Sequence, residues 1–516
     1  MFYSLVNKVI RFNLRKYMEE LFSFMNSPLE HQNLVLQELL SKGKDTAFGQ
    51  RYGFKNIQSP EDFSRNVPLH EYGNLKPMID RMRNGERDIL WPGQIQWYAK
   101  SSGTTSGVSK FIPISKENIQ ACHFAGGRYE LALHFNQNPE ARLFEGLGLR
   151  LGGSTVIEDH GKSKSGDLSA ILIQNIPTWA EFRSAPSPQT ALMSNWEEKI
   201  DAILDEVIEQ NITSFWGVSS WFLVLFEKVL ERTGKSNLLE VWPNLELFAH
   251  GGVNFAPYEA KFRELMPGNQ VTFMENYNAS EGFFAVQDSS ENDGMLLLLN
   301  SGIYYEFIPM SEFNGTQSNA IPLSEVKLGV EYAIVISTNS GLWRYLLGDT
   351  VVFTSIKPHR IRVSGRTAHF INAFGEEVIV TNAEEALKES CLKHEASIRD
   401  FHAAPVFMES GKSGAHQWMI EFENNPKDMV AFGATLDEEL QKLNSDYAAK
   451  RKGDLVLGPI KLEVATPRLF HHWLKSKGKL GGQNKVPRLS NNRKLMEEFL
   501  KLNEELEMNS VHSSIS

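Results

Sequence analysis

The chain has 516 residues, and 53 Lys plus Arg against 63 Asp plus Glu give it a formal net charge of −10. Its hydrophobic fraction of 41% is enough to fill large cores and excludes a mostly disordered chain. The acidic balance argues against a nucleic-acid-binding protein, because such proteins rely on a broad basic surface. Two cysteines, Cys122 and Cys391, exclude a disulfide scaffold and favour a reducing compartment, which we expect to be the cytoplasm.

The N-terminal region is predicted to be helical. Apolar residues recur at helical spacing over 13–41, and Ser27-Pro28 divides this stretch into two predicted helices. Residues 1–17 are apolar but interrupted by polar side chains, which predicts an amphipathic helix rather than a signal peptide. No segment approaches the roughly 18 uninterrupted apolar residues of a membrane span, so we expect none.

Short apolar runs then alternate with helical patterns. Strands are predicted at 95–99, 147–151, 169–173, 213–216 and 245–249, and helices at 116–136, 195–210 and 220–233. Alternation of this kind is typical of α/β layering.

The pattern changes twice more towards the C-terminus. Residues 270–365 read as successive strands separated by Gly, Asn and Pro turns, which predicts a β-rich subdomain. Beyond Gly365, helices are predicted at 383–394 and 427–445, and strands at 404–409, 416–422 and 460–465. We therefore predict an α/β fold with two domains. Residues 1–365 form a large domain of β-sheets flanked by helices, including the β-rich subdomain, and residues 366–516 form a smaller α+β domain.

A Gly/Ser/Thr loop after the strand at 95–99 is the strongest chemical signal. It reads Ser101-Ser102-Gly103-Thr104-Thr105-Ser106-Gly107, continuing to Lys110. Glycines allow backbone N–H groups to turn towards an anion, and hydroxyls add donors around phosphate oxygens. The spacing is not that of a Walker loop. Alone, such a loop is more often a structural linker than a phosphate site.

Three further motifs follow in order. They are Tyr277-Asn278-Ala279-Ser280-Glu281, Trp343-Arg344-Tyr345-Leu346-Leu347-Gly348-Asp349 and Gly365-Arg366. With the loop, they resemble the adenylate-forming superfamily of acyl-CoA synthetases and luciferases. The match is closest to its acyl-acid amido synthetase branch, which contains the auxin- and jasmonate-conjugating enzymes of plants. The resemblance extends over about residues 98–490 and suggests a member from outside plants.

Two positions depart from the pattern of the branch. Asn278 stands where the family usually has Gly, and Trp343 stands where plant members have Tyr. Asn tolerates a left-handed backbone better than most residues, so a turn at that position can survive. Neither change removes a charged group.

The resemblance implies ATP and Mg²⁺ as cofactors and assigns roles to the motif residues. Glu281 would bind Mg²⁺, a hard ion that prefers oxygen ligands. Tyr277 would stack on adenine, and Asp349 would accept hydrogen bonds from the ribose hydroxyls. Arg344 and Arg366 would face phosphate oxygens. The predicted nucleotide-binding set is Ser101, Ser102, Gly103, Thr104, Thr105, Ser106, Gly107, Gly252, Tyr277, Asn278, Ser280, Arg344 and Asp349. Without the resemblance, Glu281 as a helix cap and Asp349 as a turn residue would be the preferred interpretations.

A mobile lysine is expected on the C-terminal domain. Lys485, in the family-like segment Gln483–Arg488, would stabilise the charge that develops at the α-phosphate and would leave as the domain rotates. With Glu281 and Arg366 it completes the predicted catalytic set. Lys475, Lys477 and Lys479 are alternatives for the same role.

The acyl pocket is predicted between the helix at 119–135 and the segment Phe215–Phe222. Phe124 and Arg128 would contribute from the helix, and Trp216 and Val218 from the segment. The same aromatic and aliphatic side chains could equally belong to the core.

The resemblance implies an ATP-dependent ligase that adenylates a small carboxylic acid. It would release pyrophosphate and then transfer the acyl group to an amine, which in this branch is that of an amino acid, releasing AMP. An acyl-CoA synthetase is one alternative, and a non-catalytic nucleotide- or acyl-binding protein is another. The expected partners are the acid and the amine, without nucleic acid. The sequence does not predict the oligomeric state.

Overall fold

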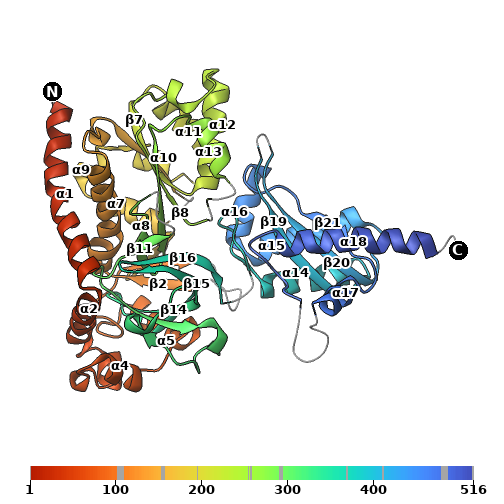
Figure 1. The fold of residues 1–516 in the computed structure, drawn as a ribbon, viewed down its shortest axis with the longest axis horizontal. Helices are drawn as coiled ribbons and strands as arrows, with labels where there is room; N and C mark the ends of the chain where they lie inside the picture. Colours follow the sequence, from red (N-terminus) through yellow and green to blue (C-terminus); the bar gives the residue numbers. More distant parts are fainter. Residues whose placement is uncertain are drawn as a thin grey trace. The chain divides into compact units, whose positions relative to one another are not determined.

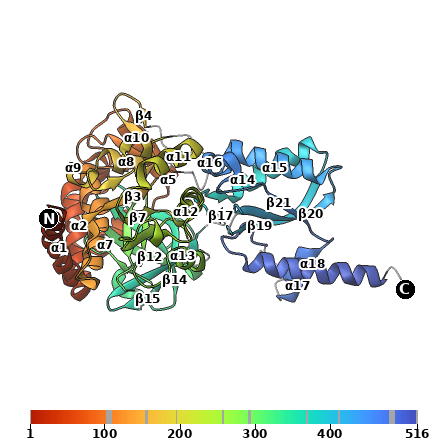
Figure 2. The same ribbon diagram turned by 90° about the horizontal axis from the view of Figure 1, so that it is seen from above.

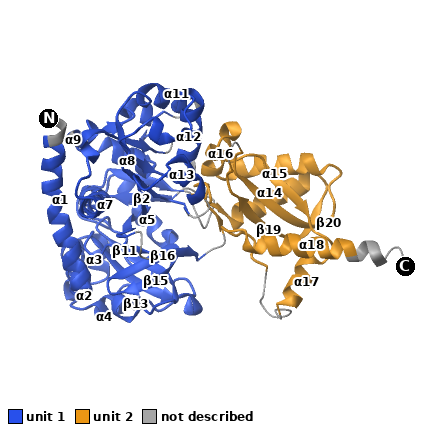
Figure 3. Cartoon of the chain, turned by 45° about the horizontal axis from the view of Figure 1, so that its top comes forward, with its two compact units in different colours: residues 1–101, 110–255, 259–367 blue, residues 102–109, 256–258, 368–516 orange. Residues whose placement is uncertain are grey.

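A computed structural model of the protein describes residues 2–101, 110–152, 157–193, 196–253, 255, 258–289, 294–367, 370–409, 412–477 and 486–513. The chain divides into two compact units (Figure 3). The large unit comprises 1–101, 110–255 and 259–367, and the small unit comprises 102–109, 256–258 and 368–516. The last division, between 367 and 368, lies close to the boundary expected at 365/366.

Two long helices open the large unit, as the sequence predicts. They are α1 (Phe2–Asn26) and α2 (Pro28–Gly43), and the break falls at Ser27. Pro28 occupies the first turn of α2, where its missing N–H is not needed. Helix α1 lies alongside α7 (Phe124–Gln137) (Figure 1), and the rings of Tyr17 and Tyr129 meet edge to face at 5.5 Å. No helix in the described part of the chain is both long and apolar enough to cross a membrane.

A sheet of 12 strands forms the centre of the large unit. Its parallel part contains β6 (Ser184–Ala185), β3 (Leu147–Leu151), β7 (Ile212–Gly217), β8 (Leu247–Gly251) and β9 (Thr272–Ala279), in that spatial order. These strands are linked through α8 (Leu168–Gln174), α11 (Trp196–Val207), α12 (Ser219–Thr233) and α13 (Glu259–Leu265). The observed arrangement is the α/β layering expected from the sequence.

Successive residues of the parallel strands face opposite sides of the sheet. On one side, Phe215 and Phe248 pack against the aromatic rings of Phe226 in α12 and Phe262 in α13. On the other side, Trp216 packs against the main hydrophobic core, which also contains residues of α7 and α8. Helices therefore cover both faces of the parallel strands.

The antiparallel part of the same sheet corresponds to the β-rich segment predicted at 270–365. Its strands are β10 (Gly282–Val286), β11 (Met295–Leu297), β12 (Ile303–Pro309), β13 (Ile321–Pro322), β14 (Glu331–Thr338), β15 (Tyr345–Ile356) and β16 (His359–Arg366). A separate four-stranded sheet contains β2 (Lys110–Ile114), β1 (Trp97–Ser101), β5 (Lys164–Gly166) and β4 (Glu158–Asp159).

One predicted strand is wrong. Residues 169–173 belong to helix α8. Ala170 and Ile171 are fully buried, and Leu168 and Leu172 pack against the same core, which is the spacing of a helical stripe. A short apolar run in the sequence does not distinguish a buried strand from a buried helix. Here the helix is formed because its spacing buries these apolar side chains against the core.

The small unit is an α+β layer structure, as predicted. Its sheet contains β19 (Ser397–Val406), β20 (Ala415–Asn424) and β21 (Lys461–Val464). Figure 2 shows α14 (Val380–Lys393) and α15 (Met429–Leu443) on one face, and α17 (Leu469–Ser476) and α18 (Lys494–Ser513) on the other. Met419 of β20 packs with Phe470 of α17 and Phe499 of α18 in one core.

Arg344 anchors the end of helix α4 (Pro60–Asn66) to the large sheet. Its Nε and Nη2 donate to the two carboxylate oxygens of Glu306, both at 2.8 Å, and its Nη1 donates to the backbone carbonyls of Ser64 and Val67. The side chain is 6% exposed. The prediction that Arg344 faces phosphate oxygens is therefore wrong, because its donors are used inside the fold.

Replacing Arg344 with Met should destabilise the large unit strongly. Burial already raises the pKa of Glu306, and the Arg344 charge opposes that rise. Without its partner, the Glu306 carboxyl is left buried, which costs about 3–5 kcal/mol. Urea unfolding monitored by Trp fluorescence measures the loss. Arg65→Met is the matched control, since Arg65 pairs with Asp62 at the surface. An unchanged unfolding midpoint together with a raised KM for ATP would restore the nucleotide role.

Candidate active site

The motif 277–281 forms a tight hairpin between β9 and β10. Ala279 pairs with Gly282, so Ser280 and Glu281 are the two loop residues. Asn278 pairs with Phe283 in extended conformation and is exposed. The left-handed backbone considered for Asn278 is not used, which explains why Gly is not required there. The hairpin brings Glu281, only 8% exposed, to a defined place at its tip.

Asp349 joins two of the other motifs. It lies directly opposite Arg366 in the antiparallel pair β15–β16, and Arg366 Nε donates to its Oδ1 at 2.6 Å. The hydroxyl of Tyr277 donates to its Oδ2, also at 2.6 Å. Asp349 is 7% exposed, so these bonds compensate a carboxylate that is almost removed from water.

Glu281 belongs to the same cluster. Burial raises the pKa of Tyr277 well above its usual value, and the negative charges of Asp349 and Glu281 raise it further. Burial likewise raises the pKa of Tyr345, with Glu281 the largest charge that adds to the rise. Tyr277, Glu281, Asp349 and Arg366, here called the carboxylate cluster, are thus one electrostatic unit.

Asp349 has the acceptor capacity that a ribose diol requires. Each carboxylate oxygen offers about two lone pairs, and one bond to each is already made. Tyr277 has a different environment from the one expected. Its ring packs on Phe284 with centroids 4.9 Å apart and is mostly buried, while its hydroxyl positions Asp349. Stacking of Tyr277 on adenine stays a prediction.

The predicted phosphate loop is described only at its two ends. Ser101, the last residue of β1, pairs with Lys110, the first residue of the antiparallel strand β2. The predicted residues Ser102, Gly103, Thr104, Thr105, Ser106 and Gly107 lie outside the described residues, as does Lys485. Of the alternative lysines, Lys477 forms an ion pair with Glu498 at 3.0 Å, and Lys475 is exposed on α17. Lys479 is outside the described residues as well.

The carboxyl ends of β7 and β8 meet at a second group of predicted residues. Val218 follows β7 and Gly252 follows β8. A Cβ on Gly252 would lie 3.3 Å from Val218 Cγ2, and its φ of 83° lies in the left-handed region that favours glycine. In parallel α/β sheets, ligands bind at this end of the strands.

The predicted acyl-pocket residues divide between two places. Trp216 and Phe124 are both partly buried against the main core, and Trp216 Nε1 donates to Ser214 Oγ at 2.9 Å. Arg128 instead donates to the carbonyl of Gln120, and its guanidinium lies 5.9 Å from the Tyr17 ring. These contacts place Arg128 beside α1. The structure therefore does not support its assignment to the acyl pocket.

Sequence reasoning missed a buried carboxyl at this edge. Glu130 of α7 is 1% exposed and accepts from Asn276 Nδ2 at 3.2 Å. Burial raises the pKa of Glu130 to about 8, with the bond from Asn276 acting in the opposite direction. Asn276 lies against Gly251, where any Cβ would clash with it. A Glu inside the apolar stretch of α7 was the only signal in the sequence.

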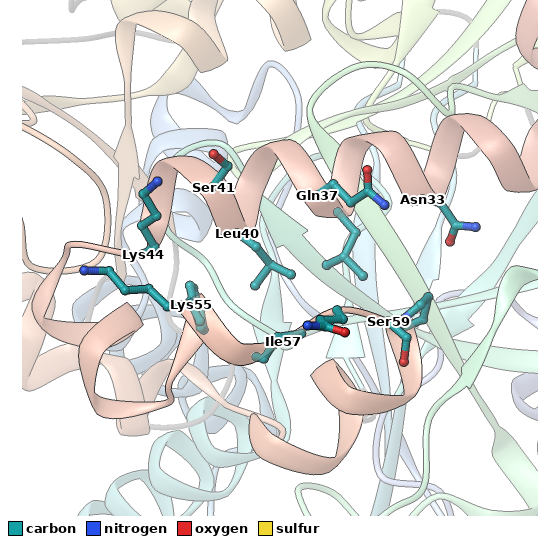
Figure 4. A pocket seen from close by; sticks show the side chains of 12 residues that line it. Asn33, Gln37, Leu40, Ser41, Lys44, Lys55, Ile57 and Ser59 are labelled. Atoms are coloured by element: carbon teal, nitrogen blue, oxygen red, sulfur yellow. The ribbon is translucent and has the colours of Figure 1, made fainter.

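A surface pocket of about 310 Å³ lies apart from these residues, between α2 and the segment 54–60 (Figure 4). Leu36, Leu40 and Ile57 contribute apolar surface, while Lys44 and Lys55 extend from its edge. None of the predicted site residues lines it.

The chain is similar to enzymes of known activity over nearly its whole length. It is 23% identical to the indole-3-acetic acid-amido synthetase GH3.3 of Arabidopsis thaliana, covering 89% of this chain and 88% of the relative. It is also 23% identical to the 4-substituted benzoates-glutamate ligase GH3.12 of the same plant, covering 89% and 92%. These relatives are ligases, as the resemblance implied.

Solved structures share the fold. The acyl acid amido synthetase AtGH3.15 in complex with 2,4-DB superposes with a TM-score of 0.62 at 19% identity, covering 96% of each chain. The match confirms a large sheet-rich domain followed by a smaller one. Family models agree along the chain: the GH3 N-terminal domain matches residues 17–271, the central domain 296–366 and the C-terminal domain 381–494. The chain belongs to the GH3 family.

Proposed function

We propose that this protein is an ATP-dependent acyl-acid amido synthetase. It activates a small carboxylic acid as the acyl-adenylate, releasing pyrophosphate, and transfers the acyl group to the amine of an amino acid, releasing AMP. The observation that carries the proposal is the carboxylate cluster, in which Tyr277 and Arg366 fix Asp349 next to the hairpin of Glu281. Relatives named for different acids support the class of substrate, small carboxylic acids, rather than one compound.

The nucleotide is positioned by residues from three segments. Asp349 accepts hydrogen bonds from the ribose hydroxyls, and the loop 101–107 donates to the phosphates. Arg366, which is held by Asp349, contacts oxygens of the α-phosphate. Phosphoryl and nucleotidyl chemistry depends mainly on such positioning and charge neutralisation.

The chain's donors fit Mg²⁺ bound with ATP. Within the described residues, no group of three or more His, Cys, Asp or Glu side chains could hold a metal alone. Mg²⁺ commonly takes one or two carboxylates and completes its shell with phosphate oxygens and water, so Glu281 alone is sufficient from the protein. When bound, the metal neutralises phosphate charge. Glu281 is held by the hairpin and lies in the negative field of the carboxylate cluster.

Two alternatives differ from this proposal in measurable ways. An acyl-CoA synthetase would make the same adenylate but use CoA as acceptor, and a panel of CoA and amino acids separates the two. A binding protein would release neither pyrophosphate nor AMP. We also place the protein in the cytoplasm, and support comes from Cys122 and Cys391, which are both free thiols.

Glu281→Gln should abolish most acid-dependent exchange between pyrophosphate and ATP. The substitution removes the metal-binding charge but keeps the shape, and we expect a loss of about 100-fold. The assay uses a panel of carboxylic acids with and without Mg²⁺. Glu331→Gln is the control, because Glu331 is exposed and accepts from Thr350 and Ser364 outside the cluster. Normal exchange by Glu281→Gln would remove Glu281 from the metal role.

Lys485→Ala should slow the first half-reaction far more than the second. Loss of an oriented cation at the α-phosphate costs about 3 kcal/mol, or about a hundredfold in rate. Rapid-quench measurement of adenylate formation, compared with aminolysis of a supplied acyl-adenylate, separates the two steps. Lys477→Ala is the control, since Lys477 already pairs with Glu498. Equal slowing of both steps would show that Lys485 has a structural role instead.

A further inference from the structure

Arg150 occupies an unusual position in the large sheet. It is the second-last residue of β3 and lies opposite Trp216 of the parallel neighbour β7. Paired residues of neighbouring strands share a face of the sheet. By the same register, Ala249 of β8 and Met274 of β9 continue this row across the sheet. Arg150 therefore lies on the face of the predicted acyl-pocket residue Trp216, near the carboxyl ends of the parallel strands.

Arg150 differs from four other arginines of the described residues whose side chains are largely buried. Arg344, Arg360, Arg366 and Arg451 each pair with a carboxylate, at 2.6–2.8 Å. Within the described residues, Arg150 forms no hydrogen bond, ion pair or ring contact. Burial lowers its pKa to about 10, and no nearby acidic group opposes that shift.

The sequence around Arg150 supplies no counter-charge either. The segment 153–156, which follows β3 in the chain and lies outside the described residues, reads GSTV and contains no acid. Arg150 is half-buried, and a guanidinium partly removed from water without a partner is unfavourable for a fold. Its fork of donors matches a carboxylate, which it can bind through two parallel hydrogen bonds.

Mostly small residues lie beyond Arg150 on the same face of the sheet. The next row of the same face, towards the strand ends, consists of Gly152, Val218, Gly251 and Asn276. The first three of these are small, and Asn276 packs against Gly251. Ligands of parallel α/β sheets bind beyond this edge. Val218 also contacts the Gly252 turn, so Arg150 lies at the same edge as the predicted substrate residues.

The distance from Arg150 to the carboxylate cluster determines which carboxylate it can hold. Strands β7 and β8 separate β3 from β9, which carries Tyr277, so the backbones lie three strand spacings apart, or roughly 14 Å. The carboxyl group that is activated must lie at the nucleotide. Arg150 is placed to bind a different carboxylate of a substrate that is being processed at the cluster.

We propose that Arg150 binds a second substrate carboxylate, one that is not activated. This inference rests on the proposed function. The carboxylate belongs either to the acceptor amino acid, as its α-carboxylate, or to a dicarboxylic acid, as its distal group. The chemistry of recognition is the same in both cases, a bidentate Arg–carboxylate pair in a site that shields it from water.

Matched substrate pairs test this role and separate the two sources. L-alanine is compared with L-alaninamide as acceptor, and hexanoate with adipate and benzoate with terephthalate as acids. We expect the wild type to prefer the carboxylate-bearing member of the acceptor pair or of the acid pairs. Arg150→Met should reduce kcat/KM for that member by about 10- to 100-fold and remove the preference, while the KM for ATP stays unchanged. Arg150→Lys should retain part of the preference, because it keeps the charge but not the fork.

Two controls distinguish binding from folding. Arg142→Met removes an exposed arginine near the same strand and should leave both preferences unchanged. The Tm of Arg150→Met without substrates should not fall, because the substitution removes an unpaired charge rather than a contact.

Failure of this proposal is distinguishable from failure of the proposed function. If Arg150→Met keeps acid-dependent exchange and every preference of the wild type, Arg150 does not bind a carboxylate, and the proposed function stands. If no carboxylic acid of the panel supports pyrophosphate–ATP exchange by the wild type, the proposed function fails. Calorimetry with L-alanine, L-alaninamide and adipate then tests Arg150 directly, and equal binding by wild type and Arg150→Met overturns the proposal.

Discussion

The site depends on one carboxylate that accepts hydrogen bonds both from a neighbouring strand and from a strand much further along the sheet. Asp349 lies in β15 and receives bonds from Arg366 in β16 and from Tyr277 in β9. Between β15 and β9 the sheet contains β16, β11 and β10. Four strand spacings in a flat sheet are roughly 19 Å, far more than a tyrosine side chain spans. The bond therefore requires the antiparallel half of the sheet to curl strongly.

Local features of the strands permit this curl. The register shifts between Ala333 and Val335 in β14 and twice along the β15–β16 pair, and such bulges bend strands and increase their twist. Strand β11 contributes only three residues, Met295–Leu297. A sheet that curls in this way brings the β9–β10 hairpin and its Glu281 towards the Asp349–Arg366 pair. The geometry of the site is thus a consequence of sheet curvature.

A single sequence motif serves both the core and the site. Trp343 is fully buried, donates from Nε1 to the carbonyl of Leu90 and stacks on Phe48. Arg344 continues this structural part, while Asp349, at the other end of the motif, holds the carboxylate cluster together. Resemblance of the whole motif to a family does not show which of its residues pack in the core and which belong to the site, because the seven-residue motif contains both kinds.

The sequence predicted those features that are set locally. The helix break at Ser27-Pro28 and the strands of 270–365 follow from residue type and spacing. The roles expected of Glu281 and Asp349 came instead from the resemblance of their motifs to a family, because residue type alone favoured a cap and a turn. Features that depend on distant neighbours were not predictable. Burial against the core decided that residues 169–173 are helical, and Glu306 decided the role of Arg344. Arg150 became notable only because the described residues place no acid beside it.

The affinity for ATP of matched aspartate variants tests the central claim most directly. Asp288 pairs with Arg360 of β16 through both carboxylate oxygens, at 2.6 and 2.9 Å, and is as well buried as Asp349. Asp349→Asn and Asp288→Asn therefore weaken comparable ion pairs on the same sheet. By titration calorimetry, Asp349→Asn should raise the Kd for ATP by about tenfold or more, and Asp288→Asn should leave it unchanged. Equal affinities of the two variants would contradict the assignment of the nucleotide site to Asp349.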